Sequence, residues 1–198
     1  LLALSLQTLG GSGFLQDYPL EQYVRDTKID TLYEGTTGIQ GQDFFFRKIV
    51  RDDANSFTVV VNEIEAFIET LERDGRLKVE ADHLATALGD VVEMVDLMLG
   101  WQDASADHPE DIHKVGQNTT RLLMCVGDLL VGWLLLRQAA VAQDALAAGA
   151  RHADADFYAG KVAVAHFFAT TVLPELAARR QVLEETDDTL MSIPDGAF

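Results

Sequence analysis

Long segments without helix-breaking residues constrain the fold of this chain more than any other feature of its sequence. The 198 residues include only four prolines, and strand-like alternation of apolar and polar residues is rare. Within residues 78–102 the apolar side chains recur at helical spacing on one stripe, which comprises Leu84, Leu88, Val91, Val92, Val95 and Leu99. The pattern predicts an all-α protein.

Turn signals divide the predicted helices. Residues 1–9 read as the end of a helix, closed by the glycine turn at residues 10–13. Pro19 suits the first turn of a second helix that runs to about residue 33, and a third helix is expected from Thr36 or Thr37 to about Arg51. Four further helices are predicted over 54–73, 78–102, 109–148 and 154–184.

Pro174 lies inside the last of these helices and is expected to kink or divide it. The tail at residues 192–198 is expected to be extended. Because long amphipathic helices joined by short links pack with antiparallel neighbours, the second part of the chain is predicted to form an antiparallel four-helix type of bundle.

The charge balance excludes some classes of partner. A formal net charge of −17 argues against binding nucleic acid or an anionic membrane surface, because both need clustered Lys and Arg. The apolar run at residues 122–136 carries Asp128 and is shorter than the roughly 20 residues that a membrane span needs. We interpret this run as a core helix and expect no membrane contact.

The single cysteine and the first residues bear on the origin of the chain. Cys125 lies in the apolar run, where a buried and inert thiol fits the reducing cytoplasm. The chain starts at Leu1, and residues 1–9 resemble the end of a helix already under way rather than a signal peptide. The expectation is a fragment of a longer protein.

Two Glu-x-x-His motifs raise the question of a metal site. Glu80 with His83, and Glu110 with His113, have the spacing found in di-iron carboxylate bundles. Helical phase places them away from the apolar stripes and towards water, so no metal site is predicted. His166, which has Phe167 and Phe168 beside it, is expected to be a core or interface histidine.

Glu34 is the candidate for acid–base chemistry. Its position at the predicted C-terminus of a helix faces it towards the negative end of the helix dipole, which favours the protonated carboxyl. The flanking Leu32 and Tyr33 are expected to shield it from water and act in the same direction. A base of this kind can accept a weakly acidic proton from carbon near neutral pH.

The segment YPLEQYVRDTKIDTLYEGT at residues 18–36 resembles, nearly residue by residue, the signature that ends the catalytic domain of acyl-CoA dehydrogenases. The resemblance covers residues 1–52. Residues 53–198 are similar to the extra C-terminal helical domain of a larger branch of that family, including the FYAGKV segment at 157–162. The predicted domains are therefore 1–52, the end of the helical catalytic domain, and 53–198, the additional helical domain.

This resemblance implies an oxidoreductase that acts on a CH–CH bond: FAD-dependent α,β-dehydrogenation of acyl-CoA thioesters to trans-2-enoyl-CoA, in fatty-acid β-oxidation. Glu34 takes the role of the general base that removes the α-proton, while the β-hydride passes to the flavin. Glu34 and Gly35 are implied to contact the substrate, and the backbone N–H of Glu34 is implied to polarise the thioester carbonyl. Arg25 and Asp26 match a family Arg-Asp pair, which we expect to form a structural ion pair.

The same resemblance implies a cofactor site. Gln7, Gly10 and Gly11 are similar to a Gln-x-x-Gly-Gly element that reaches the FAD of a neighbouring subunit, which implies a homo-oligomer. Thr36 matches a threonine that contacts FAD, whereas Gly38 departs from the glutamine that many members have there. An electron-transfer flavoprotein is the implied electron acceptor.

Without the missing N-terminal portion of the same protein, the fragment is expected to be inactive. Two other classes of protein stay open. One is a non-catalytic helical fragment that serves assembly. The other is a flavoprotein relative from the alkylation-damage response that binds DNA, which the acidity of the chain disfavours.

Overall fold

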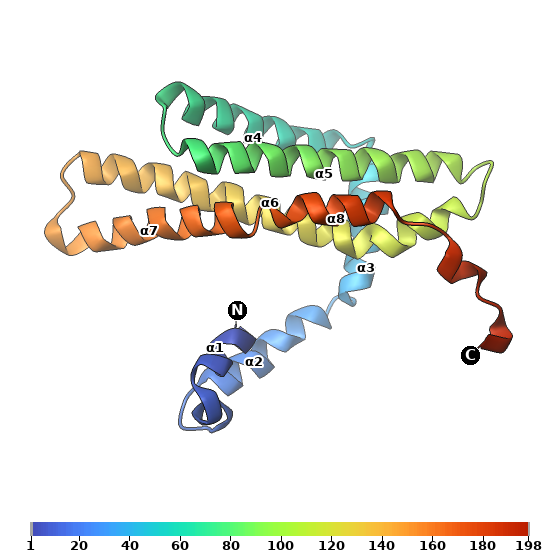
Figure 1. The fold of residues 1–198 in the computed structure, drawn as a ribbon, viewed down its shortest axis with the longest axis horizontal. Coiled ribbons are helices and arrows are strands. Elements are labelled where there is room, and N and C mark those ends of the chain that lie inside the picture. Colours follow the sequence, from blue (N-terminus) through green and yellow to red (C-terminus); the bar gives the residue numbers. More distant parts are fainter. Residues whose placement is uncertain (1, 198) are drawn as a thin grey trace. The chain divides into compact units, whose positions relative to one another are not determined.

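The computed structural model describes residues 2–197, and every regular element in that range is a helix (Figure 1). The all-α prediction is therefore confirmed. Contacts divide the chain into two compact units, one ending at Gln40 and the other beginning at Gly41. The domain boundary after residue 52, drawn from the resemblance, stays a prediction.

The first unit consists of short helices: α1 (Leu2–Thr8), η1 (Gly10–Phe14), α2 (Leu20–Lys28) and η2 (Ile29–Thr31). As predicted, a glycine turn follows the first helix, and Gly10 adopts the left-handed conformation with φ of 57°. Gly13 is buried because it packs closely on α1; a Cβ there would lie 2.3 Å from the carbonyl oxygen of Leu6. Pro19 lies at the N-cap of α2, where its missing N–H leaves no hydrogen bond unmade.

A continuous helical stretch follows, made of α3 (Thr37–Gln42), η3 (Asp43–Ile49) and η4 (Val50–Asp52). Its extent agrees with the predicted third helix. The middle part, η3, is a π-helix, a form that the sequence pattern did not predict. Phe45 and Ile49 of this π-helix are completely buried, so the wider turn delivers two large side chains to the core.

The second unit is built on α4 (Asn55–Asp74), α5 (Lys78–Ala104), α6 (Asp111–Ala147), α7 (His152–Thr171) and α8 (Glu175–Glu184). The predicted helices agree with these bounds to within two residues at each end, and Pro174 divides the last one into α7 and α8. The prediction of an extended tail is wrong at Asp195–Ala197, although Ile193 is extended, and Phe198 lies outside the described residues. Thr189–Ser192 and Asp195–Ala197 form 3-10 turns, in which the N–H of Ala197 donates to the carbonyl of Pro194 at 2.9 Å.

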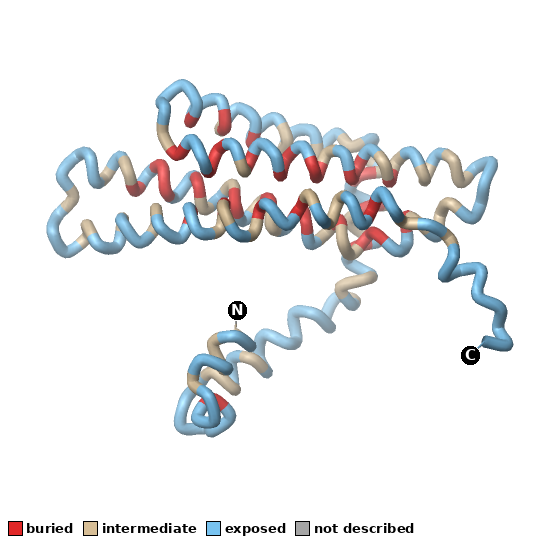
Figure 2. The backbone as a smooth tube through the Cα atoms, in the orientation of Figure 1, coloured by how far each residue is buried: buried red, intermediate tan, exposed pale blue. Residues whose placement is uncertain are grey.

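The core of the second unit is centred on α5, which packs against α4, α6, α7 and α8 (Figure 2). The predicted stripe is confirmed at Leu84, Leu88, Val91 and Val95, which are buried, while Val92 and Leu99 are half-buried. α5 buries a wider face than the stripe, because it has neighbours on several sides. The additional buried residues include Ala81, Ala87, Met94 and Met98.

α6 is the described helix that, by length and composition alone, could cross a membrane. In this fold it packs along α5 and α7 and contributes Leu122, Leu129 and Leu136 to the core. Asp128 within its apolar run bonds to Arg179 of α8, with 2.6 Å between Oδ2 and Nη1. The helix therefore has the core position that the sequence predicted for it.

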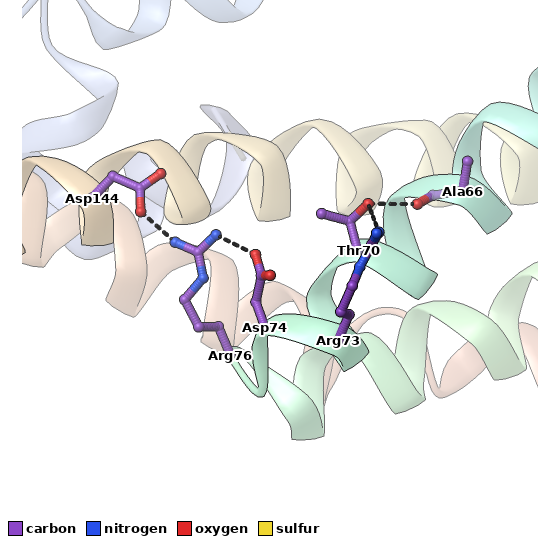
Figure 3. Close-up of polar contacts among 6 residues, drawn as sticks. All are labelled: Ala66, Thr70, Arg73, Asp74, Arg76 and Asp144. Carbon is purple, nitrogen blue, oxygen red and sulfur yellow. Dashed lines mark hydrogen bonds and ion pairs between the residues drawn. The ribbon is translucent and has the colours of Figure 1, made fainter.

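The turn between α4 and α5 is tied to α6 by one guanidinium (Figure 3). Arg76 donates to Asp74 at the end of α4 and to Asp144 of α6, with N–O distances of 2.9 and 2.5 Å. Gly75, at φ of 65°, provides the left-handed residue that ends α4. This arrangement fixes the end of α4 close to the end of α6.

Candidate functional site

Glu34 lies in a tight turn between η2 and α3, with a backbone conformation that is uncommon for a residue with a side chain. Its φ is 56°, and Gly35 follows with φ of 101°. A Cβ on Gly35 would lie only 2.9 Å from Cγ2 of Ile39, so both conformation and space require glycine there. Two consecutive left-handed residues fix the position from which the Glu34 side chain leaves the backbone.

Hydrogen bonds from Gln40 of α3 hold this turn. The side-chain amide of Gln40 donates to the carbonyl of Glu34 at 2.5 Å, and its backbone N–H donates to the carbonyl of Thr36 at 3.0 Å. The Glu34 carboxylate has no hydrogen-bond or ion-pair partner among residues 2–197. Its backbone is thus fastened while the acid itself stays available.

The predicted shielding of Glu34 is absent in this chain. Leu32 and Tyr33 are 56% and 54% exposed, and Glu34 is exposed as well. The helix before it, η2, ends at Thr31, so Glu34 lies three residues beyond the helix end rather than at it. The apolar surroundings that favour proton abstraction do not come from the neighbouring side chains.

Gln7, Gly10 and Gly11 lie on the exposed surface where α1 passes into η1. A Cβ on either glycine would meet no other atom within 4 Å, so the backbone there is open to close approach by another group. Gln7 adds a side chain that can both donate and accept hydrogen bonds. These residues therefore fit the contact with a nucleotide cofactor that the resemblance implies.

Thr36, the remaining predicted cofactor residue, is exposed and lies just before α3. Its carbonyl accepts the hydrogen bond from the backbone N–H of Gln40. The glycine turn, in contrast, packs on α1 through Gly13. The predicted site residues thus form two separate exposed groups in the first unit. The structure places each group, and their roles in catalysis and cofactor binding stay predictions.

Arg25 and Asp26 do not pair with each other. Arg25 bonds to Glu21, with 3.1 Å between Nη2 and Oε2, and Asp26 accepts a hydrogen bond from Gln22 at 2.6 Å. Consecutive side chains on a helix point in different directions, whereas residues four apart share a face. The prediction that Arg25 and Asp26 pair with each other is therefore wrong.

A cationic hollow in the second unit escaped the sequence reasoning. Arg47, Lys48 and Arg51 line it together with Asp52 and Ser56, and its volume is about 340 Å³. Arg47 pairs with Asp43 at 2.6 Å, while Lys48 and Arg51 have no ion pair among the described residues. The sequence does contain a cue for this hollow: three of the five residues 47–51 are basic, in a chain that is acidic as a whole.

Asp52 in this hollow caps the first turn of α4. Hydrogen bonds from the side chain and the backbone N–H of Ser56 lower the pKa of the Asp52 carboxyl, and the N–O distance to the backbone is 2.7 Å. The Asp52 carboxylate is thus already hydrogen-bonded to the first turn of α4. Lys48 and Arg51 remain free to meet an anion.

One of the two Glu-x-x-His motifs departs from the sequence prediction: Glu110 and His113 are exposed as predicted, whereas Glu80 is not. Glu80 is buried rather than directed to water, because α5 packs there against α7, and its Oε1 lies 2.6 Å from Nδ1 of His166. His166 itself is exposed, not part of the core. Within residues 2–197, no group of three or more His, Cys, Asp or Glu side chains is arranged to hold a metal ion.

Comparison with known proteins gives matches over the whole chain. The family model described as acetyl-CoA dehydrogenase C-terminal like matches residues 60–194, and the model of the acyl-CoA dehydrogenase C-terminal domain matches residues 1–44.

Three curated relatives illustrate the similarity. A broad-specificity linear acyl-CoA dehydrogenase, FadE5, of Mycobacterium tuberculosis is 54% identical over 197 residues, which is 100% of this chain and 32% of that protein. A butyryl-CoA dehydrogenase of Syntrophomonas wolfei is 31% identical over 98% of this chain and 31% of its own length. A 3-methylmercaptopropionyl-CoA dehydrogenase of Ruegeria pomeroyi is 32% identical over 96% of this chain and 31% of its own length. The chain thus spans about a third of the length of these relatives.

Proposed function

The chain belongs to the acyl-CoA dehydrogenase family, and from this membership we propose that it serves in the α,β-dehydrogenation of acyl-CoA thioesters to trans-2-enoyl-CoA. The relatives named above are dehydrogenases of linear acyl-CoA, butyryl-CoA and 3-methylmercaptopropionyl-CoA. They share the reaction on a CoA thioester and differ in the acyl group. Fatty-acid β-oxidation is the metabolic role that this chemistry supports.

The observation that carries the proposal is the strained turn at Glu34. A residue with a side chain costs energy in the left-handed region, and such strain persists where the surrounding structure holds it. Here Gly35 and the Gln40 bonds hold it, and the carboxylate is left without a partner. We assign Glu34 as the general base, because a fixed and unengaged carboxylate can accept the proton from Cα.

The reaction separates one proton and one hydride. The Cα–H bond breaks towards the Glu34 carboxylate, which becomes protonated, and the electron pair left on Cα forms the double bond to Cβ. FAD, when bound, supplies the acceptor for the hydride that leaves Cβ. Gln7, Gly10, Gly11 and Thr36 are the residues that would hold FAD, supported by their exposure and by the open backbone at the two glycines.

Substrate recognition is proposed for the same turn. The backbone N–H of Glu34 would donate to the thioester oxygen and stabilise the charge that develops there, with Gly35 beside it. An acyl chain packed on Leu32 and Tyr33 would provide the apolar surroundings that Glu34 lacks in this chain.

The relatives are about three times as long as this chain, which indicates what else the activity needs. We propose that activity requires the remainder of an acyl-CoA dehydrogenase polypeptide, and that this chain alone is inactive. A homo-oligomer, an electron-transfer flavoprotein as electron acceptor and a cytoplasmic location are further parts of the proposal.

The experiment uses a complete acyl-CoA dehydrogenase that carries this chain. Acyl-CoA is added, and reduction of the bound flavin is monitored through the visible absorbance of FAD. Glu34→Gln should slow bleaching by about 10²–10⁴-fold, the typical contribution of a general base, while acyl-CoA binding is retained. Glu63→Gln, an exposed glutamate of α4, is the matched control and should bleach normally. Normal turnover in Glu34→Gln would exclude Glu34 as the base.

The same samples address the two other classes of protein. A non-catalytic assembly role predicts a colourless protein that acyl-CoA does not change. A DNA-binding role predicts retention of a DNA duplex at moderate salt, which the net charge of −17 opposes.

A further inference from the structure

α6 and α7 border an open groove in the second unit, which we call the α6–α7 groove. Its volume is about 820 Å³, within the range of roughly 300–1,000 Å³ typical of small-molecule sites. Apolar side chains from three helices form most of its walls: Phe67 of α4, Leu134 and Val141 of α6, and Phe157 and Tyr158 of α7.

Two of the apolar side chains that line the groove are largely exposed to solvent. Val141 is 66% and Phe157 is 61% exposed, whereas Val115 and Val126 on another part of α6 are buried. Exposed apolar surface gathered in one hollow marks a place where another apolar group binds. The groove therefore favours a ligand with a substantial hydrocarbon part.

Two cations lie among these apolar side chains. Arg137 of α6 and Lys161 of α7 both line the groove, and they lie at similar distances along their helices from the α6–α7 turn. Cζ of Arg137 is 5.1 Å from the ring centroid of Trp133, and Nζ of Lys161 is 5.2 Å from that of Phe157. Cation–π contacts of this kind hold the charged groups in place without neutralising them.

Arg137 and Lys161 have no acidic partner among the described residues, which leaves their charge available to a ligand. The chain has 32 acidic and only 15 basic side chains, so carboxylates are plentiful. Yet neither Arg137 nor Lys161 forms an ion pair among residues 2–197. Asp144, the acid that lines the same groove, is bonded to Arg76 instead (Figure 3). The groove thus presents positive charge that an external anion can neutralise.

We propose that the α6–α7 groove is a binding site for a fatty acid. The carboxylate lies between Arg137 and Lys161, where the guanidinium can bind both oxygens, and the alkyl chain packs along Val141 and Phe157. A carboxylate suits the site because it is planar like the guanidinium of Arg137 and leaves a side open to the ammonium of Lys161. The site is distinct from Glu34 and its residues, and it does not depend on the dehydrogenase activity.

The test is isothermal titration of the full chain with dodecanoate, with binding rather than turnover as the readout. Arg137→Gln/Lys161→Gln should weaken binding at least tenfold, because it removes both cations that face the head group. The matched control is Lys28→Gln/Arg73→Gln, which removes the same charge from outside the groove and should leave binding unchanged. Val141→Asp should also abolish binding, by placing an acid on the apolar wall. Thermal melting followed by circular dichroism verifies that each variant is folded.

Other outcomes overturn the proposal. Equal binding of dodecanoate and of dodecyl glucoside, which has the same chain and a neutral head, would show that the cations play no part. Tighter binding of dodecyl phosphate would exclude the carboxylate assignment. If dodecanoate fails to bind while Val141→Asp dissociates an oligomer in size-exclusion chromatography, a second copy of the chain is the occupant and the fatty-acid site is excluded.

Discussion

The Glu80 carboxylate lies 2.6 Å from Nδ1 of His166, although the two residues are 86 positions apart in the sequence. Glu80 belongs to the first turn of α5 and His166 to the second half of α7, so this contact joins the two helices directly. The Glu80 side chain is only 11% exposed, whereas that of His166 is 56% exposed. The buried partner therefore depends on the exposed one for its hydrogen bond.

His166→Ala should destabilise the chain by about 1–3 kcal/mol, since it leaves the Glu80 carboxylate buried without a partner. Guanidinium unfolding of His166→Ala, Glu80→Gln and the double variant measures the coupling between the residues. Additive effects within about 0.5 kcal/mol would show that the contact contributes nothing to stability.

Gly41 should be intolerant of any side chain. A Cβ there would lie 2.9 Å from the backbone carbon of Thr119 and from the backbone nitrogen of Thr120, in α6. Because backbone atoms cannot move aside alone, Gly41→Ala should cost about 1–3 kcal/mol of unfolding free energy. Gly116→Ala, on an open part of α6, should instead stabilise by about 0.5–1 kcal/mol. Equal effects of the two substitutions in denaturant titrations would contradict the close approach of α3 to α6.

The Asp52 cap should give stability that depends on pH. The pKa of Asp52 is lowered in the folded chain by hydrogen bonds from the Ser56 side chain and N–H. A group with a lowered folded pKa stabilises the fold above its unfolded pKa of about 3.9, and this contribution is lost as pH falls through the folded pKa.

Asp52→Asn should therefore be less stable than the parent near neutral pH and equal to it at the acid end. Unfolding curves at several pH values measure the difference, with Asp96→Asn on the exposed face of α5 as the control. A difference that persists unchanged in acid would exclude the charge as its source.

Cys125 should resist thiol reagents in the folded state. Its side chain is fully buried, and burial raises the pKa of the thiol, although Arg179 acts in the opposite direction. Thiolate is the reactive form, so the folded chain should show negligible reaction with an aromatic disulfide reagent at neutral pH. The same reagent should titrate one thiol in guanidinium, and rapid labelling without denaturant would show that α6 opens readily.

The agreement between predicted and observed helices has a local cause. Helix bounds depend on capping, glycine and proline, which act within a turn, so Pro174 could be assigned to the break between α7 and α8 from sequence. The stripe on α5 was predictable for the same reason. The tail was not, because its 3-10 turns depend on bonds such as that from Ala197 to Pro194, for which the residue pattern gives no periodicity.

Short stretches of this chain are enough to predict that it is helical, where the long helices of its second unit begin and end to within two residues, and which family its Tyr-Glu-Gly-Thr segment resembles. Three features could be seen only in the folded chain: Glu80 is buried against His166, residues 43–49 form a π-helix, and Arg137 and Lys161 line one groove. Each of these depends on which helices become neighbours, and contacts between residues far apart in the chain leave no mark on local periodicity.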